Sequence, residues 1–444
     1  MVTDAGRRQA RISFHVSPPG TSPTALDHLG RGDTALADKV NKDSGQRGLH
    51  VCDSVWTILQ PVRWELHVPL LKEARAPGLN QEEHRMPAII DADTHVIESE
   101  RIWDFFDEEM AHRKPTLVAC PDPNNGSVRN HWVIDSKLVP HPPGKGGQAL
   151  ATPPLEDEIR NSPAWQKREM SDIDTRLSDA TAMGVDVQVI YPTLFIAFLT
   201  HDVELEVALA RSYNRFMADV CSRSEGRMRW VVVPALRDLD KTIEELHYGK
   251  EHGAVGVLFR GVEKDRSLAE PYFFPIYEEA QRLGLPICVH TGPGSPILTE
   301  MFDSRLSFVF PDVRLLPVMA FYDLAANKIP ERFPDLRWGF IESNSSWVPY
   351  LAHFLNRRFK TGRAAYGPEF FRNNQFFVAC EADEDLPYIL QYVGEDNMIT
   401  GSDYGHTDQS VELELISVLR AREDVPSPIM DKILSDNPAR FYGL

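Results

Sequence analysis

Eight short apolar runs, each rich in β-branched or aromatic residues, recur between amphipathic segments from residue 88 onward. This alternation constrains the fold strongly, because strands that alternate with helices form a parallel sheet covered by those helices. Runs such as 187–191 and 230–233 are almost continuously apolar, which is typical of strands buried on both faces. The predicted strands are 88–94, 185–191, 229–235, 254–260, 286–291, 337–342, 376–381 and 398–402, and the predicted helices include 203–224, 239–251, 271–283 and 410–422.

Eight strand–helix units predict an α/β fold, a closed (β/α)8 TIM barrel. The structural alternative is a doubly wound open sheet. No glycine-rich phosphate loop follows the first predicted strand, so the sequence gives no support for dinucleotide binding.

The first 85 residues differ from the rest of the chain. They contain 11 Lys and Arg against 10 Asp and Glu, whereas the remainder carries 36 against 55. They show no sustained hydrophobic period, and Met86 directly precedes the first predicted strand. We therefore expect an N-terminal extension over 1–85 and a barrel over 86–444. The extension is either a disordered or loosely docked arm, or a segment upstream of a native start at Met86.

Residues 121–165 are an insertion rich in Pro, Gly and Asn. Within it, 131–135 and 137–139 resemble the two strands of a short hairpin. We expect the insertion to follow the first strand and helix, and to form a lid over the barrel mouth, since long loops in compact domains are often functional. The alternative is a surface excursion without a role in binding.

Four predicted strands end in a histidine or a carboxylate. Charged side chains are seldom buried unless they are paired or bind metal, and the carboxyl ends of barrel strands meet at one mouth, where active sites of this fold lie. We therefore predict that these side chains form a metal site. They are Asp93 and His95 on the first strand, His290 on the fifth, Glu342 on the sixth and Asp403 on the eighth.

Two imidazoles and three carboxylates form a mixed ligand set that suits Fe, Zn or Mn. The three carboxylates carry three negative charges, so one divalent ion leaves the site negative and two leave it positive. A binuclear site is therefore electrostatically allowed but not required.

Several motifs resemble those of the amidohydrolase superfamily. The stretch 89–95 (IIDADTH) is similar to its first-strand motif. Segments 289–292 (VHTG), 339–349 (GFIESNSSWVP), 401–406 (GSDYGH) and 436–444 (DNPARFYGL) resemble the subgroup amidohydrolase family 2. That subgroup includes aminocarboxymuconate semialdehyde decarboxylase and related aromatic-acid decarboxylases and hydrolases. The resemblance runs from about residue 88 to 444, and it implies a metal-dependent TIM-barrel enzyme that forms a homodimer.

The resemblance assigns the ligands with two departures. The family usually has His-x-His on the first strand, where this chain has Asp93 and keeps His95. His290 matches the fifth-strand ligand, and Asp403 matches the eighth-strand aspartate, which the family uses as metal ligand and proton-transfer group. Many members have a catalytic histidine on the sixth strand, where this chain has Glu342.

The leading functional prediction is a metal-dependent hydrolase that cleaves an ester, thioester or amide bond, with Asp403, Glu342 and His290 as catalytic residues. A metal lowers the pKa of bound water, and a carboxylate can take its proton. Glu342 in place of histidine adds negative charge, which favours water activation. The alternative is a nonoxidative decarboxylase of an aromatic or unsaturated acid, and a third is a metal-free binding protein.

Substrate-binding candidates flank the predicted ligands. His406 follows Asp403 by three residues, Arg260 ends the fourth strand and Trp347 follows the sixth. The alternatives are a loop residue for His406, an ion pair with a neighbouring acid for Arg260 and core packing for Trp347. Further candidates are Glu381 as an acceptor for a ligand histidine, His353 on the helix after the sixth strand, and the apolar run 195–200 with His201, as a substrate wall or subunit contact.

Composition narrows the classes of partner. The net charge of −18 disfavours nucleic acid, which needs clustered Lys and Arg. No apolar run approaches the roughly 20 residues that span a membrane, and the five scattered cysteines show no CxxC pair. We therefore expect a cytoplasmic protein with free thiols, whose partner is a small-molecule substrate.

Overall fold

The computed structural model describes residues 88–444 except 122–125, 141–149, 304–308 and 407–410. The predicted extension over residues 1–85 lies outside the described residues.

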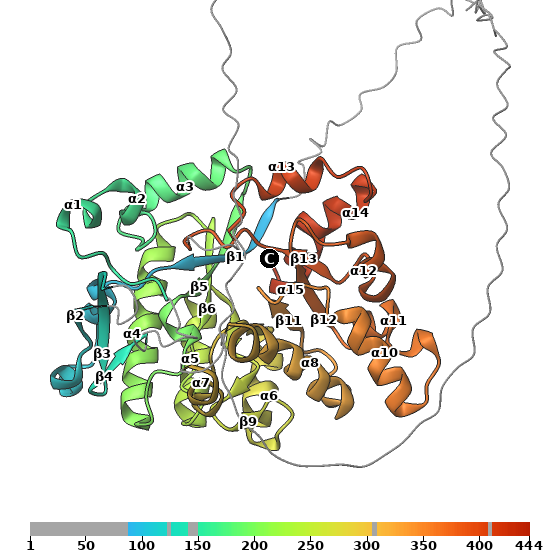
Figure 1. Ribbon diagram of the computed structural model, residues 1–444, viewed down its shortest axis with the longest axis horizontal. Coiled ribbons are helices and arrows are strands. Elements are labelled where there is room, and N and C mark those ends of the chain that lie inside the picture. The colour runs from blue at the N-terminus through green and yellow to red at the C-terminus, as the bar shows by residue number, and fades with distance from the viewer. Residues whose placement is uncertain (1–87, 122–125, 141–149, 304–308, 407–410) are drawn as a thin grey trace, which may run out of the picture. The chain divides into compact units, whose positions relative to one another are not determined.

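Eight parallel strands form the centre of the fold, and each lies next to the strand that follows it in the barrel sequence (Figure 1). This order confirms the predicted TIM barrel and rules out the doubly wound sheet, in which strand order reverses. All residues of several strands are buried, as expected for strands covered by helices. The strands are β1 (Ile90–Val96), β5 (Val187–Pro192), β6 (Met228–Val232), β7 (Ala254–Phe259), β10 (Ile287–His290), β11 (Trp338–Ile341), β12 (Phe376–Cys380) and β13 (Met398–Thr400).

The barrel closes where β1 meets the segment after β13. The backbone N–H of His95 donates to the carbonyl of Tyr404 at 2.6 Å, and that of Asp403 donates to the carbonyl of Asp93 at 3.0 Å. A Cβ atom on Gly401 would lie 2.3 Å from the Cβ of Asp93, so only glycine allows this approach. Closure therefore brings two predicted ligands, Asp93 and Asp403, to adjacent backbone positions.

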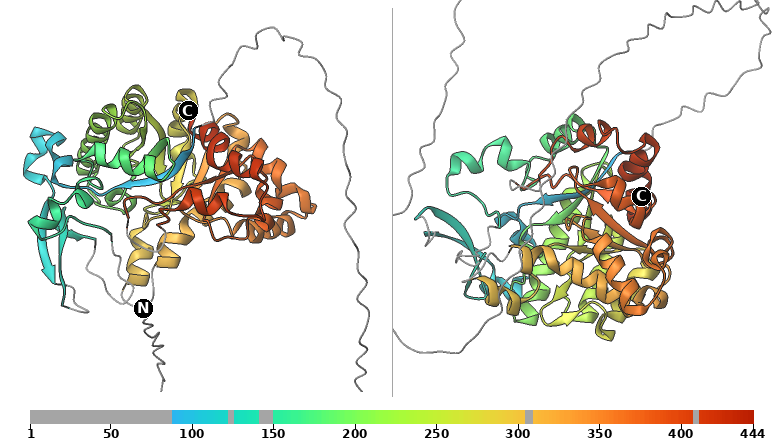
Figure 2. Two further views of the ribbon diagram at one scale, coloured as in Figure 1. Left: turned by 90° about the horizontal axis from the view of Figure 1, so that it is seen from above. Right: turned by 45° about the vertical axis from the view of Figure 1, so that its right-hand side comes forward.

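Helices follow the strands around the outside of the barrel (Figures 1 and 2). Aspartate N-caps begin several of them: Asp202 accepts from the Leu205 N–H at 3.0 Å, and Asp238 from the Lys241 N–H at 3.0 Å. The longer helices are α3 (Ile173–Ala182), α4 (Val203–Ser222), α5 (Leu239–Glu251), α6 (Phe274–Leu283), α7 (Pro296–Asp303), α8 (Leu315–Ala326), α10 (Val348–Phe359) and α12 (Leu386–Val393). Shorter ones are α1 (Asp157–Arg160), α2 (Pro163–Gln166), α9 (Ile329–Arg332), α11 (Pro368–Asn373), α13 (Leu415–Arg420), α14 (Ser427–Asp431) and α15 (Asn437–Tyr442).

Two further segments bear on the site: the 3-10 helix η3 (Leu194–Ile196) and the π-helix η5 (Val309–Arg314). Another 3-10 helix, η1 (Glu100–Phe105), follows β1. A small hairpin, β8 (Val262–Glu263) with β9 (Arg266–Ser267), follows β7. The predicted helix 410–422 is shorter than expected, with α13 beginning at Leu415.

The insertion contains the predicted hairpin, β3 (Val128–Ile134) with β4 (Lys137–Val139), and an additional strand, β2 (Thr116–Pro121), completes a three-stranded antiparallel sheet. The expected order was wrong in one respect: α3, which leads into β5, follows the insertion and does not precede it.

The small sheet lies to one side of the barrel (Figures 1 and 2). Leu150 packs with Ile196 and Ala197 in the loop after β5, and Asp135 accepts a hydrogen bond from the Thr200 hydroxyl at 2.9 Å. The insertion therefore contacts the rim of the barrel, and its role as a lid stays a prediction.

The C-terminal helix α15 packs against the barrel strands. The Tyr442 hydroxyl donates to the carbonyl of Ala92 at 2.7 Å and lies 2.7 Å from the hydroxyl of Tyr191. Phe441 packs against Gly339, where a Cβ atom would lie 2.2 Å from the ring. Within the described part of the chain, no helix is long and apolar enough to cross a membrane.

Candidate metal centre

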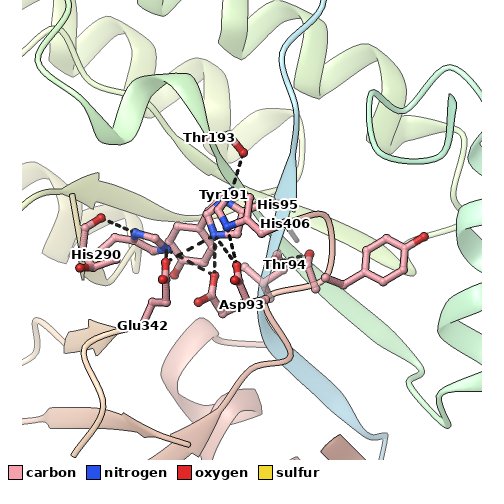
Figure 3. A network of polar contacts seen from close by, with 12 residues as sticks. Asp93, Thr94, His95, Tyr191, Thr193, His290, Glu342 and His406 are labelled. Atoms are coloured by element: carbon pink, nitrogen blue, oxygen red, sulfur yellow. Dashed lines mark hydrogen bonds and ion pairs between the residues drawn. The ribbon is translucent and has the colours of Figure 1, made fainter. Parts of the chain in front are cut away.

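The predicted ligands gather where β1, β10, β11 and β13 end (Figure 3). Asp93, His95, His290 and Glu342 form one group whose ligand atoms all lie within 4.8 Å of one another. His95 and Glu342 also belong to a second such group, with Asp403 and His406. The structure therefore brings all five predicted ligands to one place, with Asp403 on the side of His406.

The spacing of these atoms suits a shared ion. Nε2 of His95 lies 3.4 Å from Oδ1 of Asp93 and 3.4 Å from Oδ1 of Asp403. Nε2 of His290 lies 3.4 Å from the same Asp93 oxygen and 3.4 Å from Oε2 of Glu342. Two ligand atoms that bind one ion at about 2.1 Å stand roughly 3.0–3.5 Å apart, whereas an N–H···O hydrogen bond is about 2.9 Å long. The distances fit a cation better than direct hydrogen bonds.

Both histidines are oriented as ligands. Nδ1 of His95 donates to the carbonyl of Pro192 at 2.9 Å, and Nδ1 of His290 donates to the carbonyl of Thr291 at 2.7 Å. With the proton on Nδ1, the lone pair of each Nε2 faces the cluster, as in most metal-binding histidines. Burial, together with the nearby His406, lowers the pKa of His95 to about 4, so this ring is neutral at pH 7.

The carboxylates are buried and crowded. Burial raises the pKa of Glu342, and the neighbouring Asp403 raises it further. Burial also opposes ionisation of Asp93, but the imidazoles of His290 and His95 outweigh it and lower the pKa of Asp93. Oδ1 of Asp93 and Nε2 of both histidines are buried and make no hydrogen bond to any described residue. Polar atoms buried in this way are rare unless a ligand satisfies them, so the donor set fits a divalent ion.

Two of the ligands sit on unusual backbone. Glu342 has φ +49° and Asp403 has φ +54°, and Asn344, two residues after Glu342, has φ +49°. Left-handed backbone is uncommon for residues other than glycine, and such strain clusters at functional sites.

The structure places His406 beside the cluster, with both ring nitrogens engaged by the protein. Nδ1 lies 2.8 Å from Oδ1 of Asp403, Nε2 lies 2.8 Å from the Thr193 hydroxyl, and the ring stacks on His95 at 3.8 Å. Glu98 in turn accepts the backbone N–H groups of Thr193 at 3.1 Å and Leu194 at 2.7 Å. These contacts favour a positioning role for His406 rather than the predicted contact with substrate.

Arg260 forms an ion pair with Glu263. Its guanidinium binds the buried carboxylate of Glu263 and donates to the carbonyl of Ala197 at 2.9 Å. It also lines a small apolar cavity of about 30 Å³ with Phe195 and Leu258. The alternative of an ion pair with a neighbouring acid is thus the arrangement that the structure shows.

Trp347 packs against the core. Its indole N–H donates to the carbonyl of Asn344 at 2.9 Å, and its ring contacts Phe321 with centroids 5.0 Å apart. His353 is exposed on α10. These placements favour packing and surface roles over substrate binding.

The apolar run 195–200, predicted to form a substrate wall or subunit contact, is largely buried. Phe195 is buried, whereas His201 after the run is exposed. Glu381 is partly buried, and its backbone N–H donates to the Glu384 carboxylate at 3.0 Å.

Sequence reasoning missed Arg314, Thr193, Glu98 and Glu384. Arg314, the last residue of η5, approaches Oε1 of Glu342 to 3.2 Å. Glu384 accepts hydrogen bonds from the backbone N–H groups of Ser345 at 2.9 Å and Ser346 at 2.6 Å, which hold the loop after β11. Thr193 directly follows β5 and Glu98 comes two residues after β1, but their partners, like those of Arg314 and Glu384, are distant in the sequence and no local pattern marks them.

An eight-stranded α/β barrel with a buried His and carboxylate cluster at its strand ends defines a metal-dependent TIM-barrel enzyme. The comparison with known sequences specifies the class. The sequence model Amidohydro_2, which describes an amidohydrolase family, matches residues 90–444, and the chain belongs to that family.

Relatives with names or structures are distant. A 2-amino-3-carboxymuconate-6-semialdehyde decarboxylase of Dictyostelium discoideum is 23% identical over 287 residues, which is 62% of this chain and 77% of that protein. An amidohydrolase structure from Mycobacterium avium subsp. paratuberculosis has a TM-score of 0.62 at 21% identity, covering 83% of this chain and 99% of the other. A manganese-bound 5-carboxyvanillate decarboxylase from Novosphingobium aromaticivorans has a TM-score of 0.55 at 17% identity, covering 83% and 100%. The structural matches share the fold.

Proposed function

We propose that this protein is a metal-dependent nonoxidative decarboxylase of an aromatic or unsaturated carboxylic acid. The named relatives support decarboxylation over the hydrolysis that the sequence first suggested. The observation that carries the proposal is the placement of Asp403. Its Oδ1 lies 3.4 Å from Nε2 of His95 and 2.8 Å from Nδ1 of His406, so an acid stands at the candidate metal cluster with an imidazole as its ion-pair partner.

The reaction breaks one carbon–carbon bond and forms one carbon–hydrogen bond. Carbon dioxide leaves without the bonding electron pair, which stays on the ring or alkene carbon and takes a proton there. Asp403 is placed to deliver that proton, and His406 holds its carboxyl group in position. When bound, a divalent ion would orient the substrate carboxylate or a neighbouring hydroxyl and polarise it.

Manganese is the first ion to test, because the structural relative from Novosphingobium aromaticivorans contains it. Asp93, His95, His290 and Glu342 would hold the ion, with Asp403 at its edge. Iron and zinc suit the same mixture of imidazole and carboxylate.

Hydrolysis is the second candidate, and Glu342 favours it. A carboxylate where many family members have a catalytic histidine removes a proton donor and adds negative charge, which suits a water-activating centre. Cleavage of an ester, thioester or amide would then use Asp403 as the base.

The experiment is to load the protein with Mn²⁺ and present two substrate panels, hydroxybenzoates with unsaturated acids, and esters with amides. We expect CO₂ release and a decarboxylated product from the first panel, both abolished by EDTA. Turnover confined to the second panel would establish hydrolysis instead. A protein that binds neither Mn, Fe nor Zn by elemental analysis would favour the metal-free binding protein.

A further inference from the structure

The sixth strand is one of the two positions at which this chain departs from the family pattern that it resembles. Glu342 directly follows β11, with φ +49° and a side chain that is 9% exposed. Its Oε2 lies 3.4 Å from Nε2 of His290. The orientation of the Glu342 carboxylate therefore decides whether this oxygen faces the candidate metal cluster. A contact with a neighbouring residue is what holds such a carboxylate in one orientation.

Arg314 supplies that contact. Its Nη1 donates to the backbone carbonyl of Glu342 and also lies 3.2 Å from Oε1 of the same residue. One nitrogen therefore binds both the main chain and the side chain of Glu342, and the second carboxylate oxygen, Oε2, is left directed at the histidines. The Arg314 side chain is only 18% exposed, so water screens this ion pair weakly.

The position of Arg314 is itself secured from the ligand strand β10. The Thr291 hydroxyl, one residue after His290, donates to the carbonyl of Val313 at 3.0 Å. Glu342 and the segment that follows His290 are therefore linked through η5 by two hydrogen bonds.

Charge balance points the same way. With neutral imidazoles, Asp93, Glu342 and Asp403 carry three negative charges. One divalent ion and the Arg314 guanidinium carry three positive charges, which balance the three carboxylates when all of them are ionised. Without Arg314 the loaded site keeps a net negative charge in a region of low dielectric, which is unfavourable.

We propose that Arg314 is the positioning residue of an Arg–Glu unit that replaces the sixth-strand histidine and makes Glu342 a metal ligand. The proposal rests on the metal centre of the proposed function, but it concerns ion binding and not the reaction. It can therefore fail while decarboxylation is confirmed, or hold while the substrate panels show no turnover.

The test is Mn²⁺ titration by calorimetry with four single variants and one double variant of the full chain. Arg314→Met should raise the Kd for Mn²⁺ about 10- to 100-fold, the size expected when a residue supporting a ligand is lost. Arg314→Lys should fall between the wild type and Arg314→Met, because an ammonium keeps the charge with a different reach. Arg420→Met, which removes an arginine paired with Asp431 at 2.9 Å on the surface, should leave the Kd unchanged.

The double variant tests whether Arg314 acts through Glu342. Glu342→Gln should weaken binding, and adding Arg314→Met to it should weaken binding little further. Visible absorption of the Co²⁺-loaded Arg314→Met protein should also change, since it reports the ligands of the ion. A Kd within twofold of the wild type in Arg314→Met, or additive effects in the double variant, would overturn the proposal. If Arg314→Met does not fold, Arg314→Lys with a wild-type Kd and Co²⁺ spectrum would overturn it.

Discussion

Asp403 shows how much a single residue of this site is constrained. Its backbone is left-handed, its N–H is used in closing the barrel on Asp93, and its carboxylate faces both His95 and His406. Few other side chains have the length and acidity to meet all these demands. The roles of Asp403 and its neighbours are therefore best tested by isosteric changes.

Asp403→Asn should lower the rate of CO₂ release about 10²- to 10⁴-fold, because an amide of the same shape has no acidic proton to give. Binding of Mn²⁺ should persist through the remaining ligands, which calorimetry would show. Asp431→Asn, on the surface of α14, serves as the matched control and should keep full activity. Turnover near the wild-type rate in Asp403→Asn would remove Asp403 from the reaction.

Thr193→Val should lower kcat about 3- to 10-fold with little change in KM. The substitution keeps the shape of the side chain but removes the hydroxyl 2.8 Å from His406 Nε2, at a cost of about 1 kcal/mol. Thr193→Ser should retain most of the rate. Equal losses in the valine and serine variants would mean that packing, and not the hydrogen bond, is what matters at this position.

At the scale of elements, the loop after β11 depends on one acid from the loop after β12. Glu384 accepts from the N–H and hydroxyl groups of Ser345 and Ser346 and from the N–H of Glu381. The loop carries Glu342 at its start, so this carboxylate connects two strand ends to the metal centre.

Glu384→Ala should lower the free energy of unfolding by about 2–3 kcal/mol, because several buried donors lose their acceptor. Urea denaturation followed by circular dichroism would measure the loss. Glu331→Ala, which breaks an exposed pair with Lys328 at 2.9 Å, should change stability by less than about 0.5 kcal/mol. A similar small effect in Glu384→Ala would show that water replaces the carboxylate without cost.

At the scale of the whole molecule, the site couples metal binding to the stability of the barrel. The ligands come from four strands, so an ion bound only by the folded state stabilises all of them together. The predicted homodimer stays untested by these observations.

Treatment with EDTA should lower Tm by several degrees, and Mn²⁺ should restore it. At an ion concentration of 100 times Kd, the expected stabilisation is about 2.7 kcal/mol. Differential scanning calorimetry of the metal-free protein with added Mn²⁺ would measure it. A Tm independent of Mn²⁺ from micromolar to millimolar concentration would contradict the metal centre.

The metal-free protein should lose stability as pH rises, and Glu98 should contribute. Burial raises the pKa of Glu98 from 4.5 to about 8, and the N–H groups of Leu194 and Thr193 offset this only in part. Between these two pH values the folded state holds a proton that the unfolded state has lost, so raising the pH favours unfolding by up to about 1.4 kcal/mol per pH unit. Glu98→Gln should flatten this slope in urea denaturation between pH 5 and 8; an unchanged slope would exclude Glu98 as its source.

The sequence alone was enough to predict the barrel and the His and carboxylate residues that gather at one place in it, because both follow from local patterns. An apolar run predicts a buried strand wherever it lies, and a His or carboxylate at its end is exceptional in any barrel. All eight strands and the hairpin of the insertion formed where those patterns predicted them.

The tertiary structure decided which groups serve those ligands. Thr193 and His406 are 213 residues apart, Glu384 and Ser345 are 39 apart, and Arg314 reaches Glu342 from a different loop. It also decided that Arg260 and Trp347 are used in an ion pair and in packing, and that α3 follows the insertion. The physical reason is that these contacts depend on barrel closure, which sets distances between loops, whereas residue spacing along the chain describes only each strand by itself.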